Sequence, residues 1–120
     1  MTKQKIKIDI FSDINCPWCY VGERRLGKAL QQVSDQYEAE ISFKAFELNP
    51  NIPQNGMGRL DYFKGNYGES ILPQVPAMDK RMTESGAEEG IKFNFSNEMT
   101  VNNTFNGHRL IWLAEQYDVQ

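Results

Sequence analysis

The two cysteines of this 120-residue chain are separated by two residues, in the segment Cys16-Pro17-Trp18-Cys19. Residues 6–11 precede it as a strand-like run, in which apolar and polar side chains alternate before the run turns apolar. Pro17 suits the first turn of a helix, because proline has no N–H to leave unpaired there. A strand that leads directly into a helix beginning at Cys-x-x-Cys predicts a thiol–disulfide redox site.

The expected helix places the two sulfur atoms in different surroundings. Its apolar stripe, extended backwards, reaches Cys19; the stripe consists of Leu26, Leu30, Val33 and Tyr37. Cys16 would stand at the exposed N-terminus, where unpaired N–H groups and the helix dipole favour a thiolate. We therefore expect the pKa of Cys16 to lie below the free-thiol value of about 8.5, with Cys16 attacking and Cys19 resolving.

The segment also predicts the course of the reaction. A substrate thiolate attacks the Cys16 sulfur of the oxidised pair, and a second substrate thiol resolves the mixed disulfide; in the reverse direction, Cys16 attacks a substrate disulfide and Cys19 resolves it. Pro17 removes one possible N–H donor to the thiolate, and Trp18 would form an aromatic wall beside the site. The expected partners are protein or peptide thiols and disulfides.

Two other interpretations of the cysteine pair remain open. Structural zinc takes four ligands, and the sequence offers one histidine, His108, besides the two cysteines. A zinc site would therefore need carboxylates or a second chain, so we expect no metal. The pair could also be incidental thiols of a core.

Asp13 and His108 are the further candidate site residues. Asp13 precedes Cys16 by three positions and is a candidate to tune it or to accept its proton, although aspartate before a helix is also an ordinary turn residue. His108 shares a helical stripe with Phe105 and Trp112. It would either pack toward the cysteines or serve only as a structural residue of that helix face.

A resemblance to a known family rests on several blocks. They are Phe11-Ser12-Asp13, Cys16-Pro17-Trp18-Cys19-Tyr20-Val21-Gly22 followed by Arg24-Arg25-Leu26, Phe46-Glu47-Leu48-Asn49-Pro50, and Asn103-Thr104-Phe105 with His108-Arg109-Leu110. These blocks resemble the DsbA-like thioredoxin superfamily, and more closely its FrnE-type branch. The resemblance implies a dithiol oxidoreductase with a helical domain inserted into a thioredoxin fold, Cys16 as nucleophile and Cys19 as resolving residue. A related branch, the 2-hydroxychromene-2-carboxylate isomerases, binds glutathione and has Ser at the position of Cys16.

We therefore expect an α/β fold, with a thioredoxin-like strand–helix–strand unit over residues 1–48. Its second strand would run from about Glu40 to Leu48, parallel to the first through a right-handed crossover. Residues 49–58 read as a turn-rich linker, and residues 59–120 as the inserted helical domain. That domain would hold helices from Arg59 to near Gly68, from Pro76 to Gly86 or Gly90, and from a cap at Asn103 or Thr104 to about Tyr117, with Ile91, Phe93 and Phe95 in an extended piece.

The C-terminal half of a thioredoxin fold, a β-hairpin and a final helix, has no counterpart in the sequence. Neither does the cis-proline that stands beside the cysteines in this superfamily, since Val75-Pro76 fits the first turn of a helix. Two strands and a helix do not make a stable sheet. We expect an N-terminal part of a longer protein, or a chain that completes its fold with a partner. Alone, the chain would be unstable or homo-oligomeric through exposed strand residues, Ile8, Ile10, Phe43 and Ala45 among them.

Composition narrows the class of protein. A net charge of −3 with scattered lysines and arginines predicts no nucleic-acid or membrane partner. The N-terminus enters a strand with no signal-like apolar segment, which predicts a cytoplasmic location, where Cys-x-x-Cys is more often catalytic than structural.

The expected function is thiol–disulfide oxidoreductase, with no cofactor beyond the redox disulfide and with glutathione as a thiol partner. The alternatives are a redox-inert binding or chaperone-like module and a glutathione-dependent isomerase of the 2-hydroxychromene-2-carboxylate type.

Overall fold

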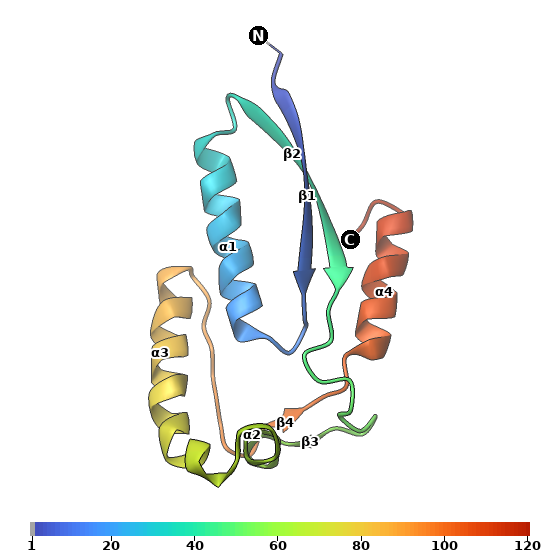
Figure 1. Cartoon of the computed structure of the whole chain (residues 1–120). Helices are drawn as coiled ribbons and strands as arrows, with labels where there is room; N and C mark the ends of the chain where they lie inside the picture. The colour runs from blue at the N-terminus through green and yellow to red at the C-terminus, as the bar shows by residue number, and fades with distance from the viewer. Residues whose placement is uncertain (1) are drawn as a thin grey trace. The chain divides into compact units, whose positions relative to one another are not determined.

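The computed structural model describes residues 2–120 (Figure 1). The chain forms two compact units. The first unit holds the chain up to Leu48 together with Thr104–Gln120, and the second unit holds Asn49–Asn103. The sequence had placed all of residues 59–120 in one helical domain. The structure instead groups the last helix with the strands, because side chains of that helix bond to the strands and to the loop before Cys16.

The first unit begins with β1 (Gln4–Ser12), α1 (Pro17–Gln32) and β2 (Tyr37–Ala45). The two strands are parallel, as expected, in a register that pairs Gln4 with Tyr37 and Ser12 with Ala45. β2 therefore starts and ends three residues earlier than the sequence indicated. It ends where β1 ends, because beyond Ala45 no strand residue remains opposite it; the N–H of Phe46 still bonds the carbonyl of Ser12 at 3.2 Å.

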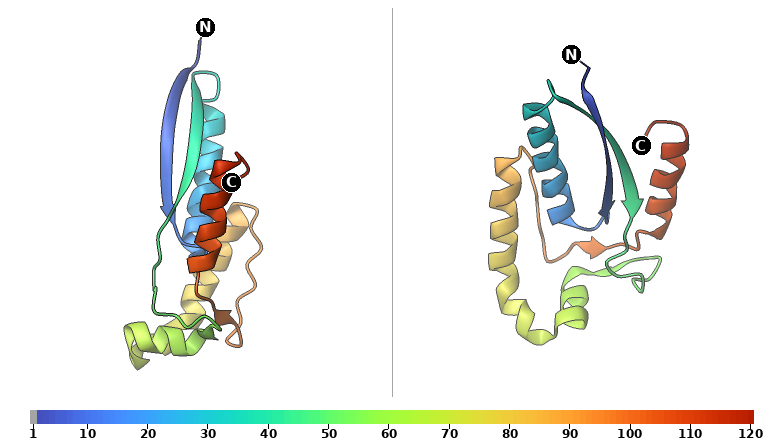
Figure 2. Two further views of the ribbon diagram at one scale, coloured as in Figure 1. Left: turned by 90° about the vertical axis from the view of Figure 1, so that its right-hand side faces the viewer. Right: turned by 45° about the horizontal axis from the view of Figure 1, so that its top comes forward.

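The last helix, α4 (Phe105–Gln116), completes the first unit. It packs against β2, and its side chains reach both the strand and the loop that follows β1. Figure 2 shows β1 and β2 side by side, with α1 and α4 running along them. The sequence placed this helix correctly, with Thr104 at the N-cap position.

The second unit is mainly helical. It contains α2 (Arg59–Tyr67), a 3-10 helix, η1 (Glu69–Gln74), and α3 (Val75–Glu88). Two short strands, β3 (Met57–Gly58) and β4 (Thr100–Val101), pair antiparallel and join its ends. Residues 49–58, expected as a linker, belong to this unit.

Aromatic rings and a buried arginine pack together in the second unit. Arg59 is buried and forms a double hydrogen bond with Asp79. Its guanidinium lies 4.9 Å from the ring of Phe63 and 5.0 Å from that of Phe95. Residues 91–96 pair with no strand, but their burial alternates as expected: Ile91, Phe93 and Phe95 are buried or half-buried, and the residues between them are exposed. The rings of Phe93 and Phe95 stack with their centroids 5.2 Å apart.

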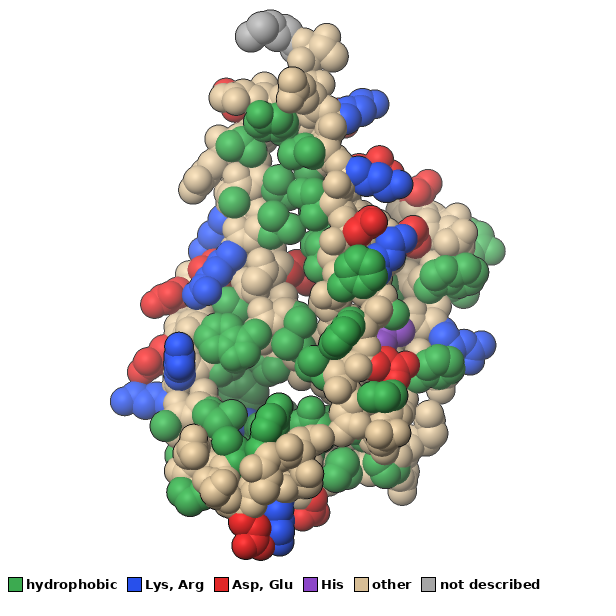
Figure 3. All heavy atoms as spheres, in the orientation of Figure 1, with side chains coloured by type: hydrophobic (Ala, Val, Ile, Leu, Met, Phe, Trp, Pro, Cys, Tyr) green, Lys and Arg blue, Asp and Glu red, His purple; other side chains and the backbone are tan. Residues whose placement is uncertain are grey.

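Apolar burial is uneven between the units. Among residues 2–120 the buried hydrophobic side chains are Val21, Ile52, Val75, Met82 and Ile91, and of these only Val21 lies in the first unit. Many hydrophobic side chains are visible on the surface (Figure 3), and Phe11 is 68% exposed. Of the strand residues expected to be partly exposed, Ile8, Ile10 and Phe43 are half-buried and Ala45 is exposed. No helix in the described chain has the length and apolar character needed to span a bilayer.

Candidate redox site

The loop after β1 places Cys16 at the N-terminus of α1, as the sequence predicted. Cys16 is the N-cap residue, with extended backbone dihedrals, and Pro17 opens the first turn. The Cys16 Sγ accepts a hydrogen bond from the N–H of Cys19 at 3.3 Å, and the N–H of Cys16 donates to the carbonyl of Asp13 at 3.1 Å. The sulfur therefore takes the place of an ordinary capping oxygen.

The two cysteines do not differ in exposure as the helical stripe had indicated. Both are half-buried free thiols, and of the residues of α1 only Val21 is buried. The stripe failed as a guide because α1 buries so little of its apolar face. Trp18, expected to form a wall beside the site, is 46% exposed and does not line the cavity at the cysteines.

The predicted acidity of Cys16 is contradicted by the structure. Burial, followed by the hydrogen bond and the charge interaction with the Cys19 thiol, raises the pKa of Cys16 from 9.0 to about 11. The backbone N–H groups of Cys19 and Trp18 act in the opposite direction but are outweighed. The N-terminus of α1 thus supplies the expected N–H donors to the Cys16 sulfur. The removal of that sulfur from water nevertheless decides the direction of the pKa shift.

Asp13 is the anchored residue of the site. It is 5% exposed, and its Oδ2 accepts the N–H of Leu48 at 2.9 Å. The side chains of Thr104 and His108 also bond to its carboxylate. Burial acts to raise the pKa of Asp13, but the bonds from Leu48, Thr104 and His108 together hold that pKa below its usual value.

His108 reaches the same point from α4. Its Nε2 lies 3.0 Å from the Oδ1 of Asp13, although the two residues are 95 positions apart, and both side chains are buried. His108 thus lies on the side of α4 that faces the cysteine loop, and its bond to Asp13 is also what a structural residue of that helix face would make. Thr104, at the N-cap of α4, makes no capping bond to its own helix because its hydroxyl serves Asp13.

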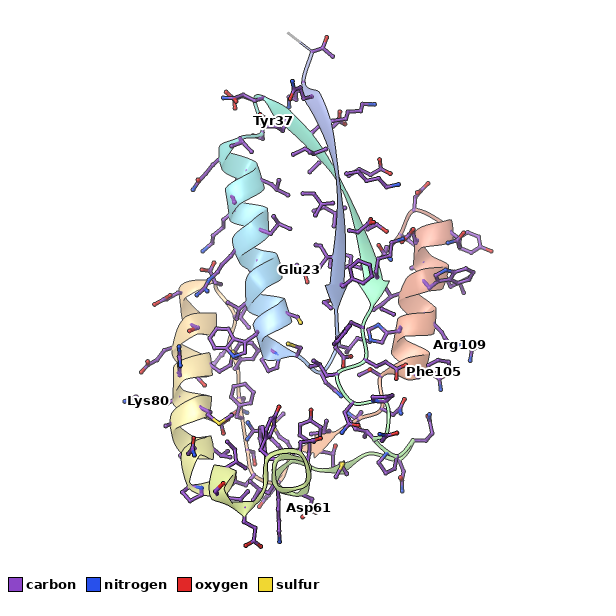
Figure 4. The ribbon with its side chains drawn as sticks, in the orientation of Figure 1. Glu23, Tyr37, Asp61, Lys80, Phe105 and Arg109 are labelled. Atoms are coloured by element: carbon purple, nitrogen blue, oxygen red, sulfur yellow. The ribbon has the colours of Figure 1, made fainter. Side chains whose placement is uncertain are left out.

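These residues share one cavity of about 360 Å³. It is lined by Asp13, Cys16, Cys19 and His108 and also by Ser12, Ile14, Tyr20, Glu23, Phe43, Lys44, Ile111 and Gln120. Glu23 lies on the side of α1 that faces the strands (Figure 4). Glu23 is not among the residues predicted for the site, although it stands one helical turn after Cys19. Lys44 and Gln120 carry no local signal, since only the register of β2 and the course of the chain after α4 bring them here.

The cavity has no evident place for a bound metal. In the part of the chain that the structure describes, no three His, Cys, Asp or Glu side chains are grouped so that they could hold a metal ion. The chemistry that these residues can perform is that of two thiols next to a buried carboxylate–imidazole pair.

Comparison with known proteins identifies the family. Residues 7–120 match the DSBA-like thioredoxin domain. The chain belongs to this family. A search of curated proteins found no match.

A solved structure supports the same assignment. The crystal structure of a probable DsbA oxidoreductase from Streptomyces coelicolor is 32% identical and superposes with a TM-score of 0.81. The match covers 93% of this chain and 47% of that one, so this DsbA-like chain spans about half the length of the structure it matches. The mixed α/β architecture, with a parallel β-α-β start and a helical insert, is therefore confirmed.

Proposed function

We propose that this DsbA-like protein is a dithiol–disulfide oxidoreductase of the FrnE type that acts on protein or peptide substrates. One observation carries the proposal: in a chain of this family, both thiols line the same cavity as the buried Asp13–His108 pair, with Cys16 at the start of α1. We further propose a cytoplasmic location and glutathione as a thiol partner.

The proposed exchange follows from the thiol positions. The Cys16 thiolate attacks one sulfur of a substrate disulfide; a Cys16–substrate bond forms, and the other substrate sulfur leaves as a thiolate and takes up a proton. Cys19 loses its proton and attacks the Cys16 sulfur, which releases the second substrate thiol and leaves the Cys16–Cys19 disulfide. Two electrons thus pass from the cysteine pair to the substrate. An external dithiol then reduces the Cys16–Cys19 disulfide and is itself oxidised to a disulfide.

The raised pKa of Cys16 bears on the direction of exchange. An acidic first cysteine stabilises the reduced form of a pair and makes its disulfide a strong oxidant. Cys16 has the opposite shift, caused mainly by burial. We therefore expect a less oxidising pair, suited to reduction or isomerisation of substrate disulfides.

Insulin reduction in the presence of dithiothreitol tests the proposal. Cys16→Ser should abolish turnover, while Cys19→Ser should accumulate mixed disulfides with substrate, detectable on non-reducing gels. Trapping by the Cys16 variant alone would reverse the two roles. A wild-type rate equal to that of the double serine variant would refute the proposal.

A redox-inert, chaperone-like function is the second candidate, and one observation favours it. A groove of about 680 Å³ lies along α4 with exposed apolar side chains at its edge, including Phe105 and Trp112. Figure 4 shows Phe105 and Arg109 on the side of α4 away from α1. A chaperone would suppress aggregation of an unfolded client equally well in the wild type and in the double serine variant. An isomerase would instead require glutathione and an unsaturated ring substrate.

A further inference from the structure

Two polar clusters attach α4 to the rest of the first unit. The loop clasp consists of Asp13, Leu48, Thr104 and His108, and it joins the start of α4 to the loop before Cys16. The strand clasp consists of Ser42, Phe43, Glu115 and Gln120, and it joins the end of α4 to β2. The two clasps hold the same helix, but only the first touches the segment that carries the cysteines.

The loop clasp is connected to Cys16 through the backbone. Three groups from distant segments hold the Asp13 carboxylate: the N–H of Leu48 at 2.9 Å, the Thr104 hydroxyl, and the His108 Nε2 at 3.0 Å. The carbonyl of Asp13 in turn accepts the N–H of Cys16 at 3.1 Å. A shift of α4 would therefore move Asp13 and, with it, the first turn of α1.

Beside the loop clasp, α4 also packs closely against the loop before Cys16. Ile14 follows Asp13, and Gly107 precedes His108. A β-carbon on Gly107 would lie 2.5 Å from the Ile14 Cδ1, so the loop and α4 approach as closely as glycine permits.

The strand clasp offers an internal control. Ser42 donates to Glu115 at 2.6 Å, and the Gln120 carboxamide bonds the N–H of Phe43 at 2.7 Å and its carbonyl at 3.0 Å. The two bonds from Gln120 to the Phe43 backbone resemble those that a further strand would make at the edge of β2. Weakening this clasp should loosen only the C-terminal end of α4, because the loop clasp still holds the start of the helix at Asp13.

We propose that Asp13 and His108 are positioning residues through which the docking of α4 sets the reactivity of Cys16. The inference rests on the proposed function only in taking Cys16 as the attacking thiol. It explains why Thr104 gives its hydroxyl to Asp13 instead of capping its own helix. The physical cause is solvation, because the clasp holds the loop in place and keeps Cys16 half-buried.

The test measures alkylation of Cys16 by iodoacetamide against pH in the full chain, with the modified cysteine located by peptide fragmentation. His108→Leu removes the donor to Asp13 and should open the loop, which would make alkylation about tenfold faster at about pH 8. His108→Gln places an amide nitrogen near the position of Nε2 and should restore the wild-type profile. The charged or titratable neighbours that line the cavity, namely Cys19, Tyr20, Glu23 and Lys44, are unchanged in every variant.

Two further variants keep the result interpretable. Thr104→Val removes a second donor while keeping the side-chain shape, so it reports on the clasp if His108→Leu fails to fold. It should accelerate alkylation in the same direction by a smaller factor. Ser42→Ala weakens the strand clasp and should lower the urea midpoint of unfolding without changing the Cys16 profile.

The inference would be overturned by an unchanged profile in folded His108→Leu or Thr104→Val, by an equal acceleration in Ser42→Ala, or by no rescue with glutamine. A slower reaction in the leucine variant would contradict the solvation argument and overturn it as well. Failure of insulin reduction with the expected alkylation profiles would instead reject the proposed function and leave the positioning role standing.

Discussion

Replacing Cys19 with alanine tests which force governs the acidity of Cys16. In the wild type the pKa of Cys16 is raised from 9.0 to about 11 by burial first, and then by the hydrogen bond and charge interaction with Cys19. A shift of that size leaves about 100-fold less thiolate than an unperturbed cysteine holds below pH 9.0. Because the thiolate is the reacting species, alkylation should be slower by about the same factor.

The variant removes the Cys19 side chain but leaves its backbone N–H, which still favours the Cys16 thiolate. The midpoint of Cys16 alkylation should therefore fall in Cys19→Ala. It should stay between 9.0 and about 11, because burial, the largest cause, remains. Thiolate absorbance followed against pH gives an independent midpoint, and Cys16→Ala supplies the background signal.

A wild-type midpoint below 9.0 would refute this reasoning. It would mean that the N–H groups and dipole at the start of α1 outweigh burial, as the sequence alone had predicted. The same shift also makes stability depend on pH. Since the folded protein holds this proton more tightly than the unfolded chain, the contribution of Cys16 to stability should be complete below 9.0 and be lost as the pH rises toward about 11.

Three further predictions concern stability, each measured by urea denaturation. Arg59→Lys loses the double hydrogen bond to Asp79 and the stacking on two rings, and should cost about 2 kcal/mol; a cost near zero would show that charge alone suffices. Gly86→Ala places a β-carbon 2.5 Å from the ring of Phe93, so it should destabilise by about 1–2 kcal/mol despite the better helix propensity of alanine. The lowered pKa of Asp13 stabilises the fold above the usual 3.8, and this contribution is lost as the pH falls below that value. Asp13→Asn should therefore show a smaller acid-induced loss than the wild type.

Local sequence signals were sufficient for the elements around the cysteines. The alternation before residue 12 indicated the strand, and Asp13 and Pro17 indicated the turn and the start of α1, because each signal depends on neighbours within one helical turn. The boundaries of β2 were displaced by three residues, since a strand ends where its partner ends. The pairing of β3 with β4 was missed, because a two-residue ladder leaves no periodic pattern to detect.

The residues of the candidate site also differ in whether a local sequence pattern reveals them. Cys16 and Cys19 could be named from sequence, because their spacing and place at a helix start are local properties. The bond between Asp13 and His108 joins residues 95 positions apart, and no local pattern encodes it. Only the docking of α4 beside the loop brings the two together.

The sequence by itself thus determined which atoms react, while tertiary structure decided how readily they do so. The backbone N–H donors at the start of α1 depend on a few adjacent residues. They were predicted from the sequence, and the structure shows the N–H of Cys19 bonded to the Cys16 sulfur. The pKa of Cys16, however, depends on how much water its sulfur retains, and that is set by α4, β2 and the loop packed around one cavity. Solvation is a property of the folded surroundings, so it reversed the sign that the helix start alone had predicted.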